Sequence, residues 1–367
     1  MESQILNWTH EIHEMLNASD IDSPCEPICG FCHFRQHTVY VMGFLATAVV
    51  IFGILANCMN ARIFTHRFMR VSLLNWYYAA LSISDLLVLI TGFLRDCLPR
   101  LADFGGTYGM YSAASTLAPA TQAIGCVAQT ASVFLTVAMS AHRFVGVCFP
   151  FRAHRICTKM NTRILIASVV GFAVLFNITR AFEVKTEELN CTLELDALIM
   201  EPDARDFRKS EYYITYYIGW AYTIVMYVIP FTLLISLNVR VIMAIKKTSN
   251  LHRRMSVKEV NSKSKEHSKE VSTSIMLVGV VIVFLVCNTP GFVANLIEVL
   301  KLVDPGDPIF GKVVDYNNLL VMINASINCF VYMSFSDKYR ALLKHYLSGG
   351  CKHDAEPLVD MTMTTGM

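Results

Sequence analysis

The stretch YSAASTLAPATQAIGCVAQTASVFLTVAMSAHRFVGVC, residues 111–148, decides the fold of this chain. Its first formally charged side chain is Arg143, close to its end. About 20 apolar residues are enough for a helix to cross a bilayer, so this stretch spans a membrane with length to spare and is expected to tilt. Polar side chains are costly when they face lipid, so Gln122, Gln129 and Ser132 are expected to point toward other helices.

The composition of the whole chain is also that of a membrane protein. Of the 367 residues, 54% are apolar and only 16% are charged, whereas soluble domains carry roughly 25% charged residues. Residues 1–38 are polar and acidic and contain no apolar core behind basic residues, so we expect no cleavable signal peptide. The first apolar span then acts as the insertion signal.

Hydropathy predicts seven membrane-spanning helices. The expected spans are residues 39–64, 73–94, 111–144, 163–182, 212–245, 273–300 and 313–335. An amphipathic helix lying on the membrane is expected at 336–347, and Cys351 behind it is a candidate for a palmitoyl anchor. The predicted fold class is an all-α membrane protein, a seven-transmembrane helix bundle with a short amphipathic eighth helix. Its regions are an extracellular glycosylated tail (1–38), the bundle (39–335), and the amphipathic helix with a cytoplasmic tail (336–367).

The charges predict how the bundle sits in the membrane. With the amino terminus outside, the inner loops and tail hold 20 of the 31 Lys and Arg against 7 Asp and Glu, and the outer side holds 10 against 21. Positive charge favours the cytoplasmic side. We therefore expect a multi-pass plasma-membrane protein with an extracellular amino terminus and a negatively charged outer face, which attracts cations.

The expected extracellular segments carry candidate modification sites. Glycosylation sequons begin at Asn7, Asn17 and Asn190. Cys25, Cys29 and Cys32 precede His33. A zinc cluster is one interpretation of these residues, but disulfide bonds are the commoner use of cysteine outside the cell.

One carboxylate lies in the middle of a span. Asp85 in the second span needs polar partners or a cation at that depth. A protonated, hydrogen-bonded acid is the plain alternative, but the other spans offer four polar groups near the same depth. A chamber able to hold a sodium ion, the only metal expected, is predicted at Asp85 with Asn57, Ser132, Asn324 and Asn328.

Six features in order across the spans resemble rhodopsin-like (class A) G-protein-coupled receptors. They are Asn57, Leu81-x-x-x-Asp85, Arg143, Pro230, Pro290 and Asn328-x-x-x-Tyr332. The resemblance covers about residues 39–351. It implies that Arg143 and Tyr332 receive a heterotrimeric G protein, that Glu270 can pair with Arg143 in the inactive state, and that the sixth span hinges at Pro290.

Departures from the common pattern narrow the resemblance. His142 stands where most members have an acid, Cys329 replaces a proline, and Ala118-Pro119 occupies the top of the third span, where most members have a disulfide cysteine. The stretches AQTASVFLTV (128–137), SEYYI (210–214) and NASIN (324–328) are similar to invertebrate FMRFamide-type neuropeptide receptors.

The missing cysteine leaves the partner of Cys191 open. Cys126 lies about 12 Å below the usual position, at 1.5 Å rise per residue. Our hypothesis is a disulfide from Cys191 to Cys25, Cys29, Cys32 or Cys97.

The resemblance implies an amidated neuropeptide of the FMRFamide (RF-amide) type as ligand. Carboxylates beside aromatic rings suit the arginine of such a peptide, and glutamine amides can bind its amidated end. The candidate ligand-binding residues are Asp96, Gln122, Gln129, Glu183, Glu211, Tyr216, Trp220, Glu298 and Asp315. Each exposed acid can instead be a solvated loop charge, and the aromatic residues can form an interfacial belt.

Other functions are disfavoured. Gly125 stands where amine receptors of this family carry an aspartate, and residues 313–335 contain no lysine for a retinal Schiff base. The alternatives are a receptor for a different peptide or, less favoured, a seven-span transporter or channel, which would carry several charges inside the membrane. No enzyme activity and no cofactor besides the sodium ion are expected. The implied partners are the peptide, a G protein, arrestin and the lipid bilayer, and not nucleic acid.

Overall fold

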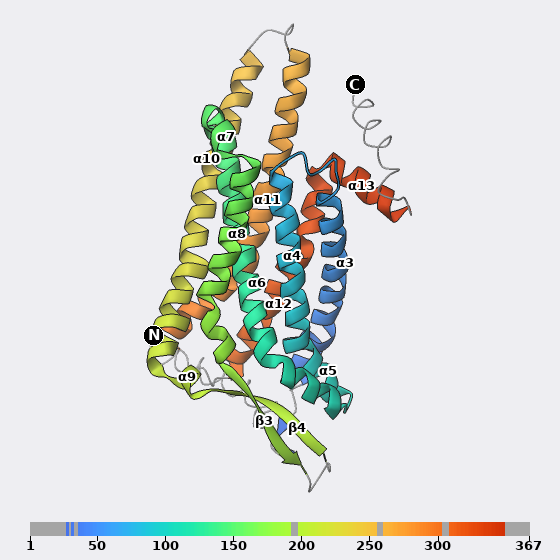
Figure 1. Cartoon of the computed structure of the whole chain (residues 1–367), viewed down its shortest axis with the longest axis vertical. Coiled ribbons are helices and arrows are strands. Elements are labelled where there is room, and N and C mark those ends of the chain that lie inside the picture. Colours follow the sequence, from blue (N-terminus) through green and yellow to red (C-terminus); the bar gives the residue numbers. More distant parts are fainter. Residues whose placement is uncertain are drawn as a thin grey trace, which may run out of the picture.

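Seven helical segments long and apolar enough to cross a membrane lie side by side in one bundle (Figure 1). The computed structural model describes residues 27–28, 31–32, 36–191, 197–254, 260–302 and 308–348. Within these ranges the spans are Gln36–Phe64, Leu74–Phe104, Gly109–Cys148, Lys159–Phe182, Tyr213–Thr248, Val271–Val299 and Ile309–Phe335. The seven predicted spans are confirmed, and most boundaries move by four residues or fewer. The second span differs, because its helix continues ten residues further.

Several spans are built from consecutive helical pieces, some of them π-helical. The first span comprises α2 (Gln36–Thr38), η1 (Val39–Leu45) and α3 (Ala46–Phe64), and the second comprises α4 (Leu74–Gly92), η2 (Phe93–Cys97) and α5 (Leu98–Phe104). The third span is α6 (Tyr108–Cys148), and the fourth comprises α8 (Lys159–Phe176) and η3 (Ile178–Phe182). The fifth span comprises η4 (Tyr213–Ala221), η5 (Ile224–Val228) and α10 (Ile229–Arg254). The sixth span belongs to α11 (Val260–Val299) and the seventh to α12 (Pro308–Phe335). The short helices α7 (Pro150–Ile156), α9 (Asp206–Lys209) and α13 (Asp337–Leu347) lie at the ends of the bundle (Figure 1).

Helix α6 contains residues 111–148 and lies at the centre of the bundle. It contacts α4, α8, α10 and both strands of the β3–β4 hairpin. Of its most apolar window, 67% is buried inside the protein, against 22% for the fourth and fifth spans. The high Ala, Ser and Thr content of α6 allows neighbouring helices to approach closely, which is how helices associate in lipid. The polar residues of its second half, Thr130, Ser132, Thr136 and Ser140, are accordingly buried.

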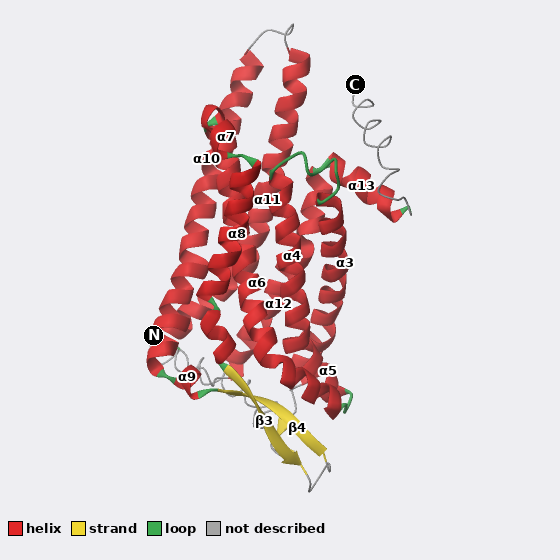
Figure 2. Ribbon diagram, viewed as in Figure 1, coloured by secondary structure: helices red, strands yellow, loops and turns green. Residues whose placement is uncertain are grey.

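The loop between the fourth and fifth spans forms a β-hairpin that the sequence did not predict. Strands β3 (Val184–Cys191) and β4 (Ala197–Ala204) pair antiparallel at one end of the bundle (Figure 2). The charged residues in this loop hid the strands, since the segment lacks a clear alternation of apolar and polar side chains. Two shorter strands, β1 (Pro27–Ile28) and β2 (Phe31–Cys32), also pair antiparallel.

The predicted amphipathic eighth helix is confirmed as α13, at the end of the bundle opposite the β3–β4 hairpin (Figure 1). Ser336 caps it by accepting a hydrogen bond from the backbone N–H of Tyr339 at 3.3 Å. Tyr339 and Leu342 are buried, and the Tyr339 hydroxyl donates to Asn60 of α3 at 2.5 Å. This bond fastens the eighth helix to the first span.

Candidate functional site

A cavity of about 240 Å³ lies between the spans, in the half of the bundle nearer the β3–β4 hairpin. Its wall comes from α4, η2, α6, η3, η4, η5, α11 and α12, so it draws on six of the seven spans. The polar and aromatic side chains that line it include Thr91, Arg95, Gln122, Gln129, Arg180, Tyr222, Tyr227, Asn295, Glu298, Phe310, Asn317 and Asn318. Mixed apolar and convergent polar walls of this kind are typical of ligand-binding sites.

Three of the nine predicted ligand-binding residues line this cavity. They are Gln122, Gln129 and Glu298. The other six residues lie elsewhere.

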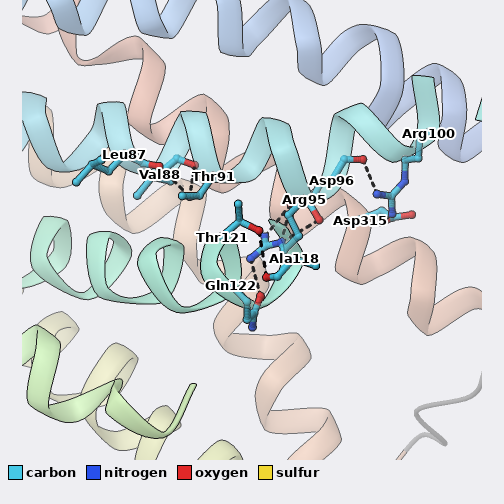
Figure 3. A network of polar contacts seen from close by, with 10 residues as sticks. All are labelled: Leu87, Val88, Thr91, Arg95, Asp96, Arg100, Ala118, Thr121, Gln122 and Asp315. Carbon is cyan, nitrogen blue, oxygen red and sulfur yellow. Dashed lines mark hydrogen bonds and ion pairs between the residues drawn. The ribbon is translucent and has the colours of Figure 1, made fainter. Parts of the chain in front are cut away.

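Asp96 and Asp315 belong to a chain of polar contacts beside the cavity (Figure 3). The guanidinium of Arg95 donates to Asp96 at 2.7 Å and to Gln122 at 3.0 Å. Arg100 donates to the Asp96 carbonyl oxygen at 2.5 Å and to Asp315 at 3.0 Å. Each carboxylate is thus already paired with an arginine of this chain. Asp96 and Asp315 therefore hold η2, α5 and α12 together, and the expectation that they offer open carboxylates to a ligand is corrected.

Glu183 is likewise occupied by its own neighbours. It is 1% exposed and accepts hydrogen bonds from Arg180 at 3.0 Å and from the Tyr213 hydroxyl at 2.7 Å. Arg208 lies 3.8 Å away, and the Glu183 backbone carbonyl accepts from the Arg205 N–H at 2.9 Å, next to the base of the β3–β4 hairpin. Glu183 therefore fixes the hairpin to the helices.

The remaining three predicted residues lie on the outside. Glu211 is exposed and pairs with Lys301 at 3.6 Å. Tyr216 and Trp220 are 64% and 43% exposed on η4, as expected of aromatic side chains that face the membrane boundary. The structure therefore separates these side chains from the cavity.

The sequence analysis missed two arginines in the cavity wall, Arg95 and Arg180. Each stands within three residues of an acid, as Arg95-Asp96 and Arg180-x-x-Glu183, near the end of a span on the side of the β3–β4 hairpin. An arginine at the edge of the hydrocarbon region, with a carboxylate in reach, is a signal that could have pointed to them.

The middle of the bundle holds the polar chamber predicted around Asp85. Asp85 is 1% exposed and accepts hydrogen bonds from Ser132 at 2.7 Å and from Asn328 at 3.0 Å. A cavity of about 10 Å³ is lined by Asp85, Ser132 and Asn324, close to the space one water molecule needs. Asn57 does not line it, because its amide donates to the Gly53 and Ala325 carbonyl oxygens.

The predicted switch residues lie toward the end of the bundle opposite the β3–β4 hairpin. The Arg143 guanidinium donates through Nε to the hydroxyl of Ser274 on α11 at 2.7 Å. Glu270 is on the same helix, but its side chain lies outside the described residues. His142 packs its ring against Tyr77, with centroids 5.4 Å apart. The structure thus links the third and sixth spans through Ser274, a residue that the sequence analysis did not single out.

Two other predicted switch residues lie within the packed helices. Tyr332 is fully buried in an aromatic cluster with Phe64, Tyr78 and Tyr339. Pro290 lies inside α11, where it removes a backbone hydrogen bond.

Ser274→Ala is expected to raise signalling in the absence of ligand about fivefold. The substitution removes a hydrogen bond between α6 and α11, worth about 1 kcal/mol, and therefore weakens the packing of the inactive state. Basal G-protein activation at matched surface expression measures this change. Ser236→Ala is the control, since among the described contacts Ser236 donates only to the Leu233 carbonyl oxygen of its own helix, α10. Equal basal activity in both variants would argue against a restraining role for Ser274.

The predicted modification sites are only partly visible. Asn7, Asn17, Cys25, Cys29 and Cys351 lie outside the described residues. Asn190, Cys191 and Cys32 are described by their strand backbones alone. Cys97 is a buried free thiol, so of the four candidate partners of Cys191 this one is not bonded.

Comparison with known proteins agrees with the fold. The model of the 7 transmembrane receptor (rhodopsin family) matches residues 56–332. The chain is 31% identical over 305 residues to the FMRFamide receptor of Drosophila melanogaster, covering 83% of this chain but only 53% of that receptor.

Two receptors of Caenorhabditis elegans are also similar. The probable G-protein coupled receptor frpr-1 is 25% identical, with 87% of this chain and 85% of that receptor covered. The FMRFamide peptide receptor frpr-18 is 27% identical, with 83% and 68% covered. Since the family model matches most of its length, this chain belongs to the rhodopsin family of seven-transmembrane receptors.

Proposed function

We propose that this chain is a plasma-membrane receptor for an amidated neuropeptide that ends in Arg-Phe-amide, and that it activates a heterotrimeric G protein. The observation that carries the proposal is the cavity, in which Glu298 faces the same space as Gln122 and Gln129. The names of the FMRFamide receptors to which the chain is similar support the same ligand class. The chain spans about half the length of the Drosophila receptor.

The side chains of the cavity match the chemistry of such a peptide end. The arginine carries a cation, which pairs with the Glu298 carboxylate through charge-assisted hydrogen bonds. The terminal amide both donates and accepts, as do the side-chain amides of Gln122 and Gln129. The phenylalanine ring fits against Tyr222 and Tyr227, which line the same space.

We propose that the end of the bundle with the β3–β4 hairpin is extracellular. The distribution of Lys and Arg supports this orientation, and it lets the peptide enter from outside. At the opposite end, Arg143 and Tyr332 would receive the G protein once α11 moves outward about Pro290. Arrestin would use the same surface.

We also propose that the chamber at Asp85 binds a sodium ion that stabilises the inactive state. Asp85→Asn removes the negative charge that would hold the ion, so it is expected to abolish the effect of sodium on peptide affinity. Binding measured in sodium and in potassium chloride at equal ionic strength tests this. Ser84→Ala is the control, because Ser84 donates to the Ala128 backbone carbonyl rather than to Asp85. A sodium effect that persists in Asp85→Asn would remove the ion from the proposal.

A receptor for a different peptide is the second candidate. It is favoured by Arg95 and Arg180 in the cavity wall, because guanidinium groups also suit an acidic side chain near the end of a peptide.

A peptide panel separates the two candidates. Cells expressing the full chain are exposed to amidated Arg-Phe peptides, to the same peptides with free carboxyl ends, and to amidated peptides with an acidic residue in place of arginine. Calcium and cyclic-nucleotide responses report activation. The proposal expects responses to the first group at the lowest concentrations. A lowest effective concentration for the acidic group would favour the second candidate instead.

A further inference from the structure

One side chain in the wall of the cavity has hydrogen-bond donors that the fold leaves unused. Arg180 is 7% exposed and donates through Nη1 to both carboxylate oxygens of Glu183, at 3.0 and 3.2 Å. Its Nε is buried without a hydrogen-bond partner, and Nη2 donates to no residue that the structure describes. A buried donor left unsatisfied costs about 1–3 kcal/mol. An oxygen atom of a bound ligand would remove that cost.

The other arginine in the wall provides a contrast. Arg95 uses all three of its nitrogens, since Nε and Nη2 donate to Asp96 and Nη1 donates to Gln122. Arg95 is therefore committed to the chain of contacts beside the cavity. Of the two guanidinium groups, only that of Arg180 has nitrogens without an acceptor among the described contacts.

The position of Arg180 is set by its neighbours rather than by a ligand. Its guanidinium carbon lies 5.4 Å from the ring centre of Tyr217 and 5.2 Å from that of Tyr222, within the range of cation–π contacts. Glu183 holds Nη1 and is itself fixed by Tyr213. A donor that is held before binding loses little entropy when a ligand arrives, which favours affinity.

The charge around Arg180 favours a neutral oxygen over a carboxylate. Glu183 offsets the charge of Arg180 at 3.0 Å, so the pair acts more as a dipole than as a cation. Glu298 contributes a further carboxylate to the same cavity. A ligand that ends in a carboxylate would face this like charge, whereas a carbonyl of an amide would not.

We propose that Arg180 donates a hydrogen bond to the terminal carbonyl oxygen of the bound peptide and so determines the preference for an amidated end. This inference rests on the proposed function and adds a residue that recognises the terminal amide of the peptide. In this assignment Gln122 and Gln129 accept from the terminal N–H groups, and Glu298 binds the arginine of the peptide.

The test compares the binding of two ligands to three receptors. The ligands are Phe-Met-Arg-Phe-amide and an analogue that ends in 2-phenylethylamide and therefore lacks the terminal carboxamide. The receptors are the full chain, Arg180→Lys and the matched control Arg100→Lys, since Arg100 pairs with Asp315 and does not line the cavity. Lysine keeps the positive charge beside the acid in both variants, but it has no Nε donor and no planar fork.

The readout is the ratio of the two dissociation constants in each receptor. The unchanged chain should bind the analogue about tenfold more weakly, the combined effect of losing the hydrogen bond from Arg180 and the contacts with the glutamines. In Arg180→Lys the ratio should fall to about threefold, because only the glutamine contacts remain. In Arg100→Lys the tenfold ratio should persist even if both ligands bind more weakly.

Three results would overturn the assignment while the proposed function stands. They are equal binding of the two ligands by the unchanged chain, a tenfold ratio kept in Arg180→Lys, and a ratio lost equally in Arg100→Lys. If no amidated Arg-Phe peptide binds the unchanged chain, the proposed function fails and this inference fails with it. Should Arg180→Lys not reach the cell surface, the same ratio is measured in the double variant Arg180→Gln with Glu183→Gln, which keeps the pair neutral.

Discussion

Glu298→Gln is expected to lower the potency of an amidated arginine-containing peptide about 30- to 100-fold, while surface expression stays unchanged. Among the described residues that line the cavity, Glu298 is the only acid. Losing one partner of a partly desolvated ion pair costs about 2–3 kcal/mol, which corresponds to that change in affinity. Glutamine keeps nearly the same shape, so the helix should pack as before.

The control for this prediction is Glu211→Gln. Glu211 is also an acid near the same end of the bundle, but its side chain is 83% exposed and pairs with Lys301 at 3.6 Å. A surface pair of this kind contributes little, so the potency of the peptide should change less than about threefold. Equal losses in the two variants would mean that a general negative field, and not Glu298, attracts the peptide.

A second measurement changes the arginine of the peptide and compares its affinity for the same receptors. Replacing its arginine by citrulline removes the positive charge at almost constant shape. The unchanged chain should lose affinity for the citrulline peptide, whereas Glu298→Gln should bind the two peptides almost equally. If the citrulline peptide is weaker by the same factor in both receptors, the arginine pairs with a different group.

Glu183→Ala is expected to destabilise the folded receptor by about 3–5 kcal/mol. Removing one partner of a buried ion pair leaves the other charge without compensation, and here Arg180 would remain 7% exposed with no carboxylate. The substitution also removes the acceptor of the Tyr213 hydroxyl and the carboxylate near Arg208. The melting temperature of purified receptor should fall by about 5–10 °C.

Two further variants distinguish this mechanism from a general effect of substitution. Glu211→Ala, an exposed acid, should melt within about 2 °C of the unchanged chain. The double variant Glu183→Leu with Arg180→Met should recover most of the lost stability, because apolar side chains can replace a buried ion pair without penalty. A single variant as stable as Glu211→Ala would show that Glu183 does not hold the fold together.

The importance of Glu183 for stability is related to the sequence at the start of the third span. Ala118-Pro119 stands where most members of the family have a disulfide cysteine. Among the described contacts, the bonds of Glu183 fix the base of the β3–β4 hairpin next to η3 and η4. Thr186 also donates to the Ser115 carbonyl oxygen on α6 at 3.4 Å. Polar contacts therefore position the hairpin against the third span.

Hydropathy placed all seven spans, and the amphipathic pattern of residues 336–347 placed the eighth helix. Hydropathy succeeded because crossing a bilayer imposes a length and a composition on each helix separately, without reference to its neighbours. The sequence also predicted that Ser132 points inward and that Asp85 has polar partners at its depth in the membrane, because polar groups are costly wherever they face lipid. Residues 95–104 were missed as helix because Arg95, Asp96 and Arg100 lowered the local hydropathy.

The role of the acids near the ends of the spans was decided partly by local sequence and partly by tertiary structure. Asp96 and Glu183 have an arginine one and three residues away in the same segment, and they pair with it. Asp315 pairs with Arg100 from a separate span, and Glu298 lies in the wall of the cavity. Membrane insertion and the two local ion pairs depend on the residues of one segment, whereas the Arg100–Asp315 pair and the place of Glu298 depend on how separate segments are placed against each other. The sequence by itself therefore determined the bundle, and only the packing of its helices determined which charges remain for a ligand.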